Sequence, residues 1–482
     1  MSSIMRGRDS ACSRRPRRPP ALAVCLISVA LVGCGNAAAG PLSTVVARPS
    51  DSFVDSVGIN IHSGFTDTAY ADQSRVISLL QGLGIRHVRD EWENTQNPDG
   101  TPNGKSAVVS AFEALHAAGI GVTALVDDGT GAPPWGLAAA EVEQRIVQIA
   151  AVEAGSPGIF DGLEGPNEWD GIGDPNWAAD DLAAQKLIFD DAQASPGLEP
   201  VPVIAPSVIQ GTTPLPSLAG LADEANLHYY PGTAGPETLL DSIAAAHNPP
   251  GSPLVTTETG YTTGYVPGGA IPPGVAPVDE AAQATYLPRL LAEAFGDGSR
   301  RTFIYELLDT VPGSGDQGPA VADNANQHFG LVGDDYSPKP AYAAVQRLLA
   351  LLAEPSAPTF TPGTLTFEVR AAGPAAVGPG TVADEGPPAA VDVRTVLLER
   401  SDGTFQLLVW RADADVFAGG PGVPFGPRQV PPLPVTIDLL HPVASAAVYV
   451  PNAGPAAIRA VVRGNQVSFP LGADLAVVDL TT

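Results

Sequence analysis

The sequence predicts an α/β fold, a (β/α)8 TIM barrel with a C-terminal antiparallel β-sandwich, and three observations point to it. Eight short runs rich in Val, Ile and Leu alternate with amphipathic stretches of helical period. This alternation continues over roughly 300 residues, within the usual range for a single (β/α)8 barrel. A series of antiparallel strand signals then follows a segment rich in Pro, Ala and Gly. At 482 residues the chain also exceeds the usual size of one hydrophobic core, so two folded units are expected.

The barrel is expected over residues 53–352. Its eight strands are predicted at residues 57–62, 87–90, 121–126, 162–165, 203–206, 226–229, 254–258 and 302–306. Helices are predicted at residues 72–83, 107–118, 141–154, 179–192, 215–223, 237–247, 279–295 and 341–352. The segment after the first strand, residues 60–64, is not a Gly-rich dinucleotide-binding turn, which argues against an open doubly wound sheet.

The accessory β-sandwich is expected over residues 353–482. Its strands are predicted at residues 364–370, 394–400, 405–411, 435–439, 446–450, 457–462, 466–469 and 473–480. Asp402 and Gly403 lie between two of these strands and form a strong hairpin signal, because this pair readily adopts the positive φ angles that tight hairpin turns require.

The N-terminus has the features of a lipoprotein signal peptide, expected over residues 1–33. Six arginines precede an apolar run at residues 21–32, which is too short to span a membrane. The run ends in Leu31-Val32-Gly33-Cys34, which resembles a bacterial lipobox, so Cys34 is the expected site of lipidation. Residues 34–52 are small and polar and are expected to form a tether. The predicted location is the cell envelope, outside the cytoplasm, with the chain lipid-anchored to the cell membrane.

The charge balance excludes several classes of partner. Without the leader the chain holds 19 basic and 51 acidic residues, a formal charge of −32. Such a surface repels phosphate backbones and anionic headgroups, so no nucleic-acid partner is expected, and the membrane is expected to be contacted through the N-terminal lipid only. Neutral partners such as uncharged carbohydrates meet no such repulsion.

Two of the predicted barrel strands end in carboxylates, at the C-terminal edge where barrel enzymes carry their reactive groups. The fourth strand leads into Glu164-Gly-Pro-Asn167-Glu168-Trp169, and the seventh ends in Val255-Thr-Thr-Glu258. This pattern resembles glycoside hydrolase clan A, the 4/7 superfamily of retaining enzymes. The resemblance covers the barrel, and the predicted sandwich is similar to the accessory domain common in that clan. The later segment His328-Phe-Gly-Leu331 is similar to families 39 and 5, between which the sequence does not decide.

The resemblance implies a retaining glycoside hydrolase that cleaves the O-glycosidic bonds of a β-linked oligo- or polysaccharide by double displacement. Glu168 would be the acid/base and Glu258 the nucleophile, with the carboxyl groups ~5 to 5.5 Å apart. Asn167 would hydrogen-bond the sugar 2-hydroxyl. No cofactor is implied, and the sequence has neither a His-Glu-x-x-His pair nor a cysteine cluster that would bind a metal.

Further positions match the clan at other strand ends. Arg89 is similar to the arginine that hydrogen-bonds the nucleophile, and the segment His228-Tyr-Tyr230 would place His228 and Tyr230 beside Glu258. Clan members carry a tryptophan platform after strand eight, whereas this chain has Tyr305 and Glu306, either of which would substitute for it.

Three residues are candidates on position alone. His62 ends strand one and is a candidate for contact with a sugar hydroxyl, and Trp169 for stacking on a sugar face. Glu164 alternates with Glu168 along strand four and is expected to support the site.

Asp90, Glu91 and Glu93 compete for any acid role, although a solvated loop explains them as well. Two other functions remain open. A non-catalytic carbohydrate-binding lipoprotein would need the cleft but not the carboxylates, and a transglycosylase would use the same carboxylates with a sugar as acceptor.

Overall fold

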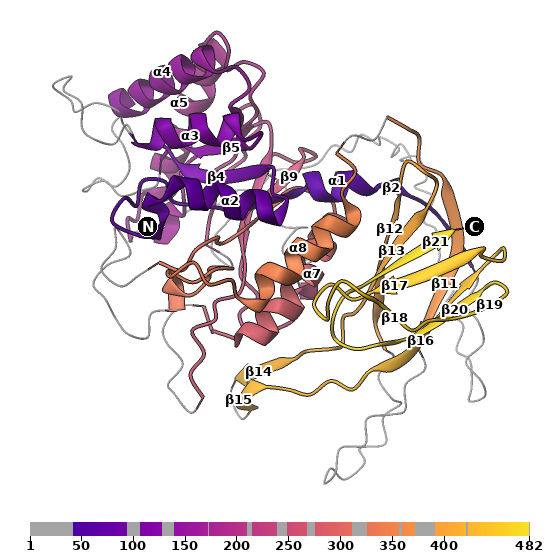
Figure 1. The fold of residues 1–482 in the computed structure, drawn as a ribbon. Helices are drawn as coiled ribbons and strands as arrows, with labels where there is room; N and C mark the ends of the chain where they lie inside the picture. Colours follow the sequence, from indigo (N-terminus) through magenta and orange to yellow (C-terminus); the bar gives the residue numbers. More distant parts are fainter. Residues whose placement is uncertain are drawn as a thin grey trace, which may run out of the picture. The chain divides into compact units, whose positions relative to one another are not determined.

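Eight parallel strands form the central sheet of the protein, in the order β7-β6-β5-β4-β3-β10-β9-β8 (Figure 1). Their bounds are β3 Val57–Asn60, β4 His87–Glu91, β5 Gly121–Leu125, β6 Phe160–Glu164, β7 Val203–Ile204, β8 Ala225–Tyr229, β9 Leu254–Thr259 and β10 Ser299–Ile304. A parallel bridge from Ile204 to Glu224, the residue before β8, brings the two edges of the sheet together. The predicted TIM barrel is therefore confirmed, with all eight predicted strands present.

This computed structural model describes residues 42–93, 107–127, 139–171, 173–209, 215–238, 248–267, 275–310, 325–355, 359–371, 391–420 and 423–481. The expected signal peptide and the lipobox cysteine, Cys34, lie outside these residues. No helix in the described part of the chain combines the length and the apolar character needed to span a membrane.

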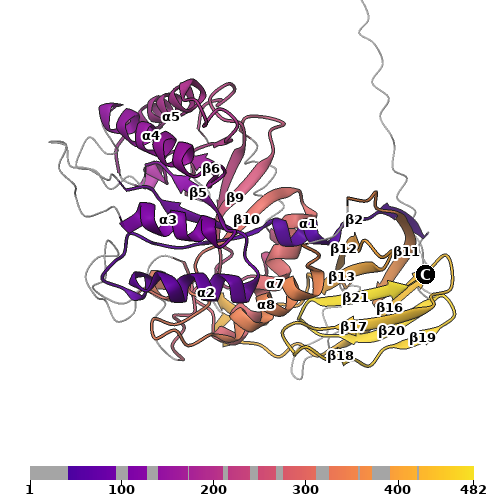
Figure 2. The same cartoon turned by 45° about the horizontal axis from the view of Figure 1, so that its top comes forward.

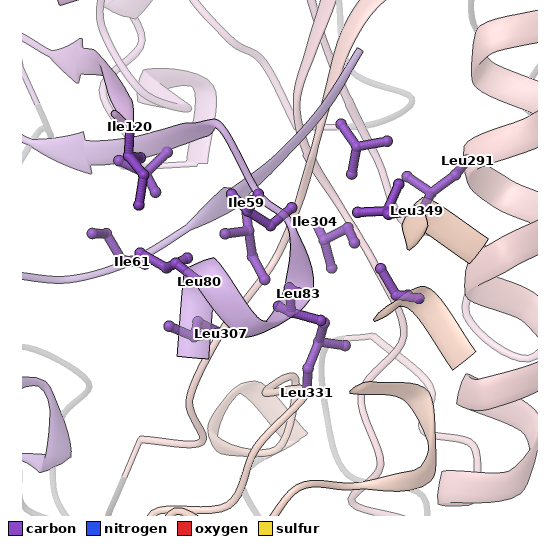
Figure 3. Packing of buried hydrophobic residues seen from close by; sticks show 14 of the residues in the cluster. Ile59, Ile61, Leu80, Leu83, Ile120, Leu291, Ile304, Leu307, Leu331 and Leu349 are labelled. Carbon is purple, nitrogen blue, oxygen red and sulfur yellow. The ribbon is translucent and has the colours of Figure 1, made fainter. Parts of the chain in front are cut away.

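In the described parts of the chain, six long helices accompany the strands. They are α2 Gln73–Leu83, α3 Ala107–Ala117, α4 Ala139–Gly155, α5 Trp177–Ala194, α7 Glu280–Gly296 and α8 Pro340–Leu352. Figure 2 shows α3, α4 and α5 outside β5 and β6. Helix α2 turns its apolar face to the sheet, with the side chains of Val76, Leu80 and Leu83 buried, whereas α7 is buried on all sides from Ala282 to Phe295. In Figure 3, Leu80 and Leu83 lie close to Ile59 of β3, one of the strand residues that they cover.

The interior of the barrel is filled by apolar side chains below the polar end. Ile204, Val255 and Phe303 form a buried cluster contributed by three strands. A Cβ atom at Gly58 would lie 2.4 Å from the ring of Phe303, so only glycine fits opposite this ring. This packing closes the barrel beneath the strand ends that carry the polar residues.

The prediction of a helix at residues 215–223 is wrong. The segment is a turn with a short bridge between Ala219 and Ala222, and Gly220 has a φ of 76°. The Asp223 carboxylate accepts a hydrogen bond from the backbone N–H of Val203, and this contact holds the turn against β7 at 2.9 Å. Of the helix predicted at residues 237–247, the first two residues belong to a 3₁₀ turn, Pro236–Thr238, and residues 239–247 lie outside the described chain.

Two mainly antiparallel sheets form the predicted sandwich, and most of their strands follow the barrel in the chain. Their strands are β11 Thr364–Ala371, β12 Val393–Glu399, β13 Phe405–Arg411, β16 Leu433–Leu439, β17 Ser445–Tyr449, β18 Ala457–Ile458, β19 Val461–Arg463, β20 Gln466–Leu471 and β21 Ala476–Thr481. The hairpin signal at Asp402-Gly403 marks a real turn between β12 and β13, with Gly403 at a φ of 86°. The single strand predicted at residues 457–462 is divided into β18 and β19, which pair in different sheets. A further hairpin, β14 Phe417–Gly420 with β15 Val423–Pro427, was not predicted.

The described part of the expected tether, residues 42–52, contains two strands and the start of a helix. Strand β1, Ser43–Val46, pairs with β11, and β2, Arg48–Pro49, pairs with β12. A short helix, α1 Ser50–Asp55, then places Phe53 and Val54 in the core. These strands were not predicted because they lie at sheet edges, where few of their side chains are buried. They therefore lack the apolar pattern of a buried strand.

Candidate active site

The polar residues of the candidate site lie at the C-terminal ends of the barrel strands. Glu164 is the last residue of β6, His228 lies near the end of β8, and Glu258 is the penultimate residue of β9. Because parallel strands end at the same rim, residues far apart in the sequence meet there. Arg89, close to the end of β4, completes this group.

Glu168 lies on a turn that follows β6. Its φ angle is 51°, in the left-handed region that side-chain-bearing residues rarely adopt. The backbone N–H of Glu168 donates to the carbonyl of Ser207 at 3.1 Å, and Gly171 N–H donates to the carbonyl of Glu168 at 2.9 Å. These bonds hold the unusual conformation, which is the kind of local strain that concentrates at functional sites.

Glu168 and Glu258 face each other across His228. One carboxylate oxygen of each residue and a ring nitrogen of His228 all lie within 4.8 Å of one another. The side chain of Glu168 is 29% exposed and that of Glu258 is 11% exposed, so solvent reaches both carboxylates. Two carboxylates this close at the mouth of a barrel can act on the same bond of a bound ligand.

Arg89 holds the carboxylates in place from below. Its guanidinium donates to Glu258 at 2.7 Å, to both oxygens of the fully buried Glu164, to Asn60 at 2.9 Å and to Asn167 at 2.8 Å. Burial would lower the pKa of Arg89, but the charges of Glu164 and Glu258 raise it above the ordinary value. The guanidinium therefore remains charged and fixes both carboxylates.

Asn167 is oriented by its oxygen atom. The side-chain oxygen accepts hydrogen bonds from Arg89 at 2.8 Å and from the Ser207 hydroxyl at 3.2 Å. The amide NH2 group is consequently directed away from Arg89 and is the donor that Asn167 can offer to a ligand.

His228 is fully buried and contacts both carboxylates. Nδ1 lies 2.7 Å from Glu168 Oε1 and 3.5 Å from Glu258 Oε2, and Nε2 lies 3.0 Å from the hydroxyl of Thr257. The single hydroxyl proton of Thr257 is directed to Glu164 or Asn226, so its oxygen accepts from Nε2–H. Burial alone would lower the pKa of His228, but Glu258 and Glu168 together raise it, and Nδ1–H donates to Glu168.

Tyr230 donates its hydroxyl to Glu258 at 2.6 Å. Burial and the charge of Glu258 raise the pKa of Tyr230 well above its ordinary value, so the phenol stays protonated and remains a donor. Glu258 thus receives a charged donor, Arg89, on one oxygen and a neutral donor on the other.

Three candidates occupy places that differ from those expected. Trp169 is 2% exposed, so both faces of its ring are already covered and are not open to a sugar. Glu306 is completely buried and accepts from the Tyr70 hydroxyl at 3.2 Å. His62 is buried between Glu91 and Glu306, and neither His62 nor Glu306 is exposed for contact with a sugar. Tyr305 is partly exposed, and its ring packs edge-on against Tyr230 and Phe329.

Asn60, Ser207, Asn226 and Thr257 belong to the network but were not singled out from the sequence. Each is an uncharged polar residue within a barrel strand or, for Ser207, three residues after the end of one. A buried polar residue requires a partner, so an uncharged polar side chain near a strand end was a usable signal.

A metal ion has one conceivable site among the described residues, the group Glu168, His228 and Glu258. The hydrogen bond between His228 and Glu168 already accounts for the closest approach in this group. The arrangement can therefore be explained as an acid pair with a histidine between its members.

Comparison with known proteins supports the fold. No protein-family model and no curated protein sequence matches the chain. Among solved structures, a family 39 glycoside hydrolase from the gut symbiont Bacteroides cellulosilyticus WH2 aligns with a TM-score of 0.56 at 15% identity, covering 90% of this chain and 81% of that one.

Two further structures align over 90% of this chain. The GH39 enzyme from Xanthomonas axonopodis pv. citri gives a TM-score of 0.55 at 15% identity, with 95% of its own chain covered. A monomeric beta-xylosidase from Caulobacter crescentus CB15 gives 0.54 at 14% identity, with 97% of its chain covered. The chain therefore shares its fold with these glycoside hydrolase structures, as the resemblance implied.

Proposed function

We propose that this protein is a retaining glycoside hydrolase that cleaves β-linked glycosides by double displacement. The proposal rests on one observation, the pair of carboxylates at the ends of barrel strands four and seven whose oxygens lie within 4.8 Å. Inverting enzymes need room for a water molecule between the groups and separate them by ~6.5 to 9.5 Å. The shared fold of known glycoside hydrolases is consistent with this assignment.

In the first step, a carboxylate oxygen of Glu258 attacks the anomeric carbon while Glu168 gives its proton to the departing glycosidic oxygen. The carbon–oxygen bond to the aglycone breaks, and a glycosyl ester on Glu258 forms. In the second step, water attacks the same carbon, Glu168 takes up the proton of that water, and the ester bond breaks. Each step inverts the carbon, so the product keeps the starting configuration.

The neighbouring donors suit these roles. Arg89 and Tyr230 hydrogen-bond the two oxygens of Glu258 and thereby hold the attacking carboxylate in place. His228 contacts Glu168 and Glu258, so it fixes the direction in which each carboxylate faces. The NH2 group of Asn167, next to Glu168, is placed to donate to the 2-hydroxyl of the sugar.

The proposal is tested by following aryl β-glycoside hydrolysis by NMR and identifying the first anomer released. The β-anomer is expected to appear before mutarotation produces the α-anomer. Initial release of the α-anomer would require inversion and would contradict the assigned roles. Binding of the glycosides without any turnover, across a panel of glycones, would favour the carbohydrate-binding alternative.

We also propose that the chain is exported and anchored to the membrane through a lipid on Cys34, on the basis of the Leu31-Val32-Gly33-Cys34 sequence. When the full chain is expressed in a bacterium with a labelled fatty acid, the label is expected in the protein and the protein in the membrane fraction. Cys34→Ser is expected to abolish both the fatty-acid labelling and the recovery of the protein in the membrane fraction. Equal labelling of the parent and the Cys34→Ser variant would rule out this anchor.

A further inference from the structure

The polar residues of the barrel mouth lie in two layers. The lower layer holds Asn60 on β3 and Arg89 on β4, which are paired in register and hydrogen-bonded to each other. Side chains two residues apart on a strand share a face and are displaced by about 7 Å along it. His62 and Glu91 follow Asn60 and Arg89 by two residues, so they form an upper layer closer to the opening.

The upper layer is held rigid around His62. Nδ1 of His62 lies 3.4 Å from Glu91, Nε2 lies 3.1 Å from Glu306, and the Phe65 ring stacks on the imidazole with centroids 4.6 Å apart. Burial would lower the pKa of His62, but Glu91 and Glu306 raise it well above the ordinary value. A protonated His62 thus holds a carboxylate on each side.

Glu91 is the member of this layer that remains open. Its side chain is 25% exposed, whereas Glu306 is completely buried. Burial would raise the pKa of Glu91, but the charge of His62 lowers it overall, so the carboxylate is ionised. Among the described residues its ion pair is with His62, and a quarter of its side chain is exposed.

Glu91 and Glu258 each contact a ring that packs against Tyr305. The Tyr305 ring centroid is 5.7 Å from that of His62, which lies 3.4 Å from Glu91, and 6.4 Å from that of Tyr230, whose hydroxyl bonds Glu258 at 2.6 Å. Burial and the charges of Glu306, Glu258 and Glu91 all raise the pKa of Tyr305, so its phenol stays protonated. The two carboxylates therefore belong to one cluster of side chains around Tyr305.

The partly exposed charged residues in the described part of the site are all acidic. Glu91, Glu168 and Glu258 are partly exposed, whereas Arg89 and His228 are buried in contacts with carboxylates. In the described part of the mouth, a sugar hydroxyl finds acceptors, but a sugar carboxylate would face like charges without a cation to pair with.

From this arrangement we infer that Glu91, positioned by His62, accepts hydrogen bonds from glycone hydroxyls remote from the anomeric carbon and makes the site selective for uncharged glycones over uronic acids. The inference rests on the proposed glycosidase function and names the substrate class of that same site. A carboxylate accepts hydroxyl hydrogen bonds more strongly than a neutral group, so removing its charge weakens neutral substrates and relieves the repulsion of acidic ones.

The test compares aryl β-glucoside with β-glucuronide and β-galactoside with β-galacturonide, pairs that differ in CH2OH against carboxylate. The parent is expected to prefer each neutral member by about 100-fold or more in kcat/KM. Glu91→Gln is expected to raise KM for the neutral members about 10-fold with little change in kcat, and to reduce the preference about 10-fold or more. Glu143→Gln, the same change at an exposed position of α4, is expected to alter neither quantity.

Glu91→Asp separates the effect of the negative charge from the effect of side-chain length. The shorter side chain keeps the charge but moves the carboxylate away from the sugar, so KM for the neutral members is expected to rise while the uronosides remain poor substrates. Equal kcat/KM for glucoside and glucuronide in the parent, or an unchanged preference in a folded Glu91→Gln, would overturn the inference.

Calorimetric titration of the parent with the same glycosides distinguishes this inference from the proposed function. If none is hydrolysed but the neutral members bind about 100-fold more tightly than the uronosides, catalysis is refuted and the role of Glu91 is supported. If the glycosides are hydrolysed but binding shows no such preference, the function stands and the role of Glu91 is refuted.

Discussion

Glu258→Gln is expected to lower kcat on the order of 10⁶-fold, because a neutral amide cannot replace the attacking carboxylate. The change is isosteric, and the surrounding donors tolerate it. Arg89, 2.7 Å from one oxygen of Glu258, can continue to donate to the amide oxygen. The Tyr230 hydroxyl, 2.6 Å from the other oxygen, can rotate and accept from the amide NH2. The loss of rate should therefore occur in a protein that folds and still binds sugar.

Two measurements test the role of Glu258. The first is the rate of aryl β-glycoside hydrolysis, and the second is trapping of the glycosyl-enzyme with a 2-deoxy-2-fluoro glycosyl fluoride. The parent is expected to carry a stable glycosyl label on the peptide that contains Glu258, and Glu258→Gln is expected to carry none. Thermal unfolding of the variant, close to that of the parent, is the control for folding. A label on Glu91 or Glu164, or substantial turnover by Glu258→Gln, would refute the role of Glu258.

The barrel was predictable because several of its strands are buried on both faces and helices such as α2 are buried on one face. Leu254–Thr259, all buried, reads as a continuous strand, and Val76, Leu80 and Leu83 recur with helical period. The turn at residues 215–223 has neither a continuous run of buried strand residues nor apolar residues that recur with helical period. It is held by Asp223 and by a small apolar cluster around Leu218, which are tertiary contacts that no local pattern reveals.

The edge strands β1 and β2 could not be predicted for a related reason. Their residues pair with β11 and β12, more than 300 positions later in the chain, and all four residues of β1 are exposed. The residues of β1 and β2 form strands because their backbones pair with other strands, and not because their side chains are buried. Their amino-acid composition is therefore similar to that of a linker.

The site was predictable to the extent that topology determines it. The proximity of Glu168 and Glu258 was predictable because the ends of strands four and seven meet at one rim, and one carboxylate oxygen of each lies within 4.8 Å of the other. Burial was not predictable, since it depends on neighbouring loops. His62 and Trp169 lie near the correct rim but are covered, whereas Glu91, which a solvated loop explained equally well, is the exposed carboxylate beside His62.

Glu168→Ala is expected to reduce kcat/KM for substrates with poor leaving groups by about 10²- to 10⁴-fold, because the departing oxygen then receives no proton. The effect should nearly disappear for a dinitrophenyl glycoside, whose leaving group departs without protonation. For that substrate the second step becomes slow, since no base deprotonates the attacking water, and the glycosyl-enzyme accumulates. A burst of dinitrophenol followed by slow turnover is the expected time course.

Added azide separates an acid/base role for Glu168 from a purely structural one. Removing the side chain leaves space next to His228, whose Nδ1 lies 2.7 Å from Glu168 in the parent. Azide needs no general base, so it is expected to attack the glycosyl-enzyme, restore turnover of the dinitrophenyl substrate and yield a β-glycosyl azide. Glu143→Ala, on an exposed face of α4, is the matched control and should show neither the burst nor the rescue. If Glu168→Ala slows both leaving groups equally and azide restores nothing, Glu168 only supports the fold of the site, and a different acid must protonate the leaving group.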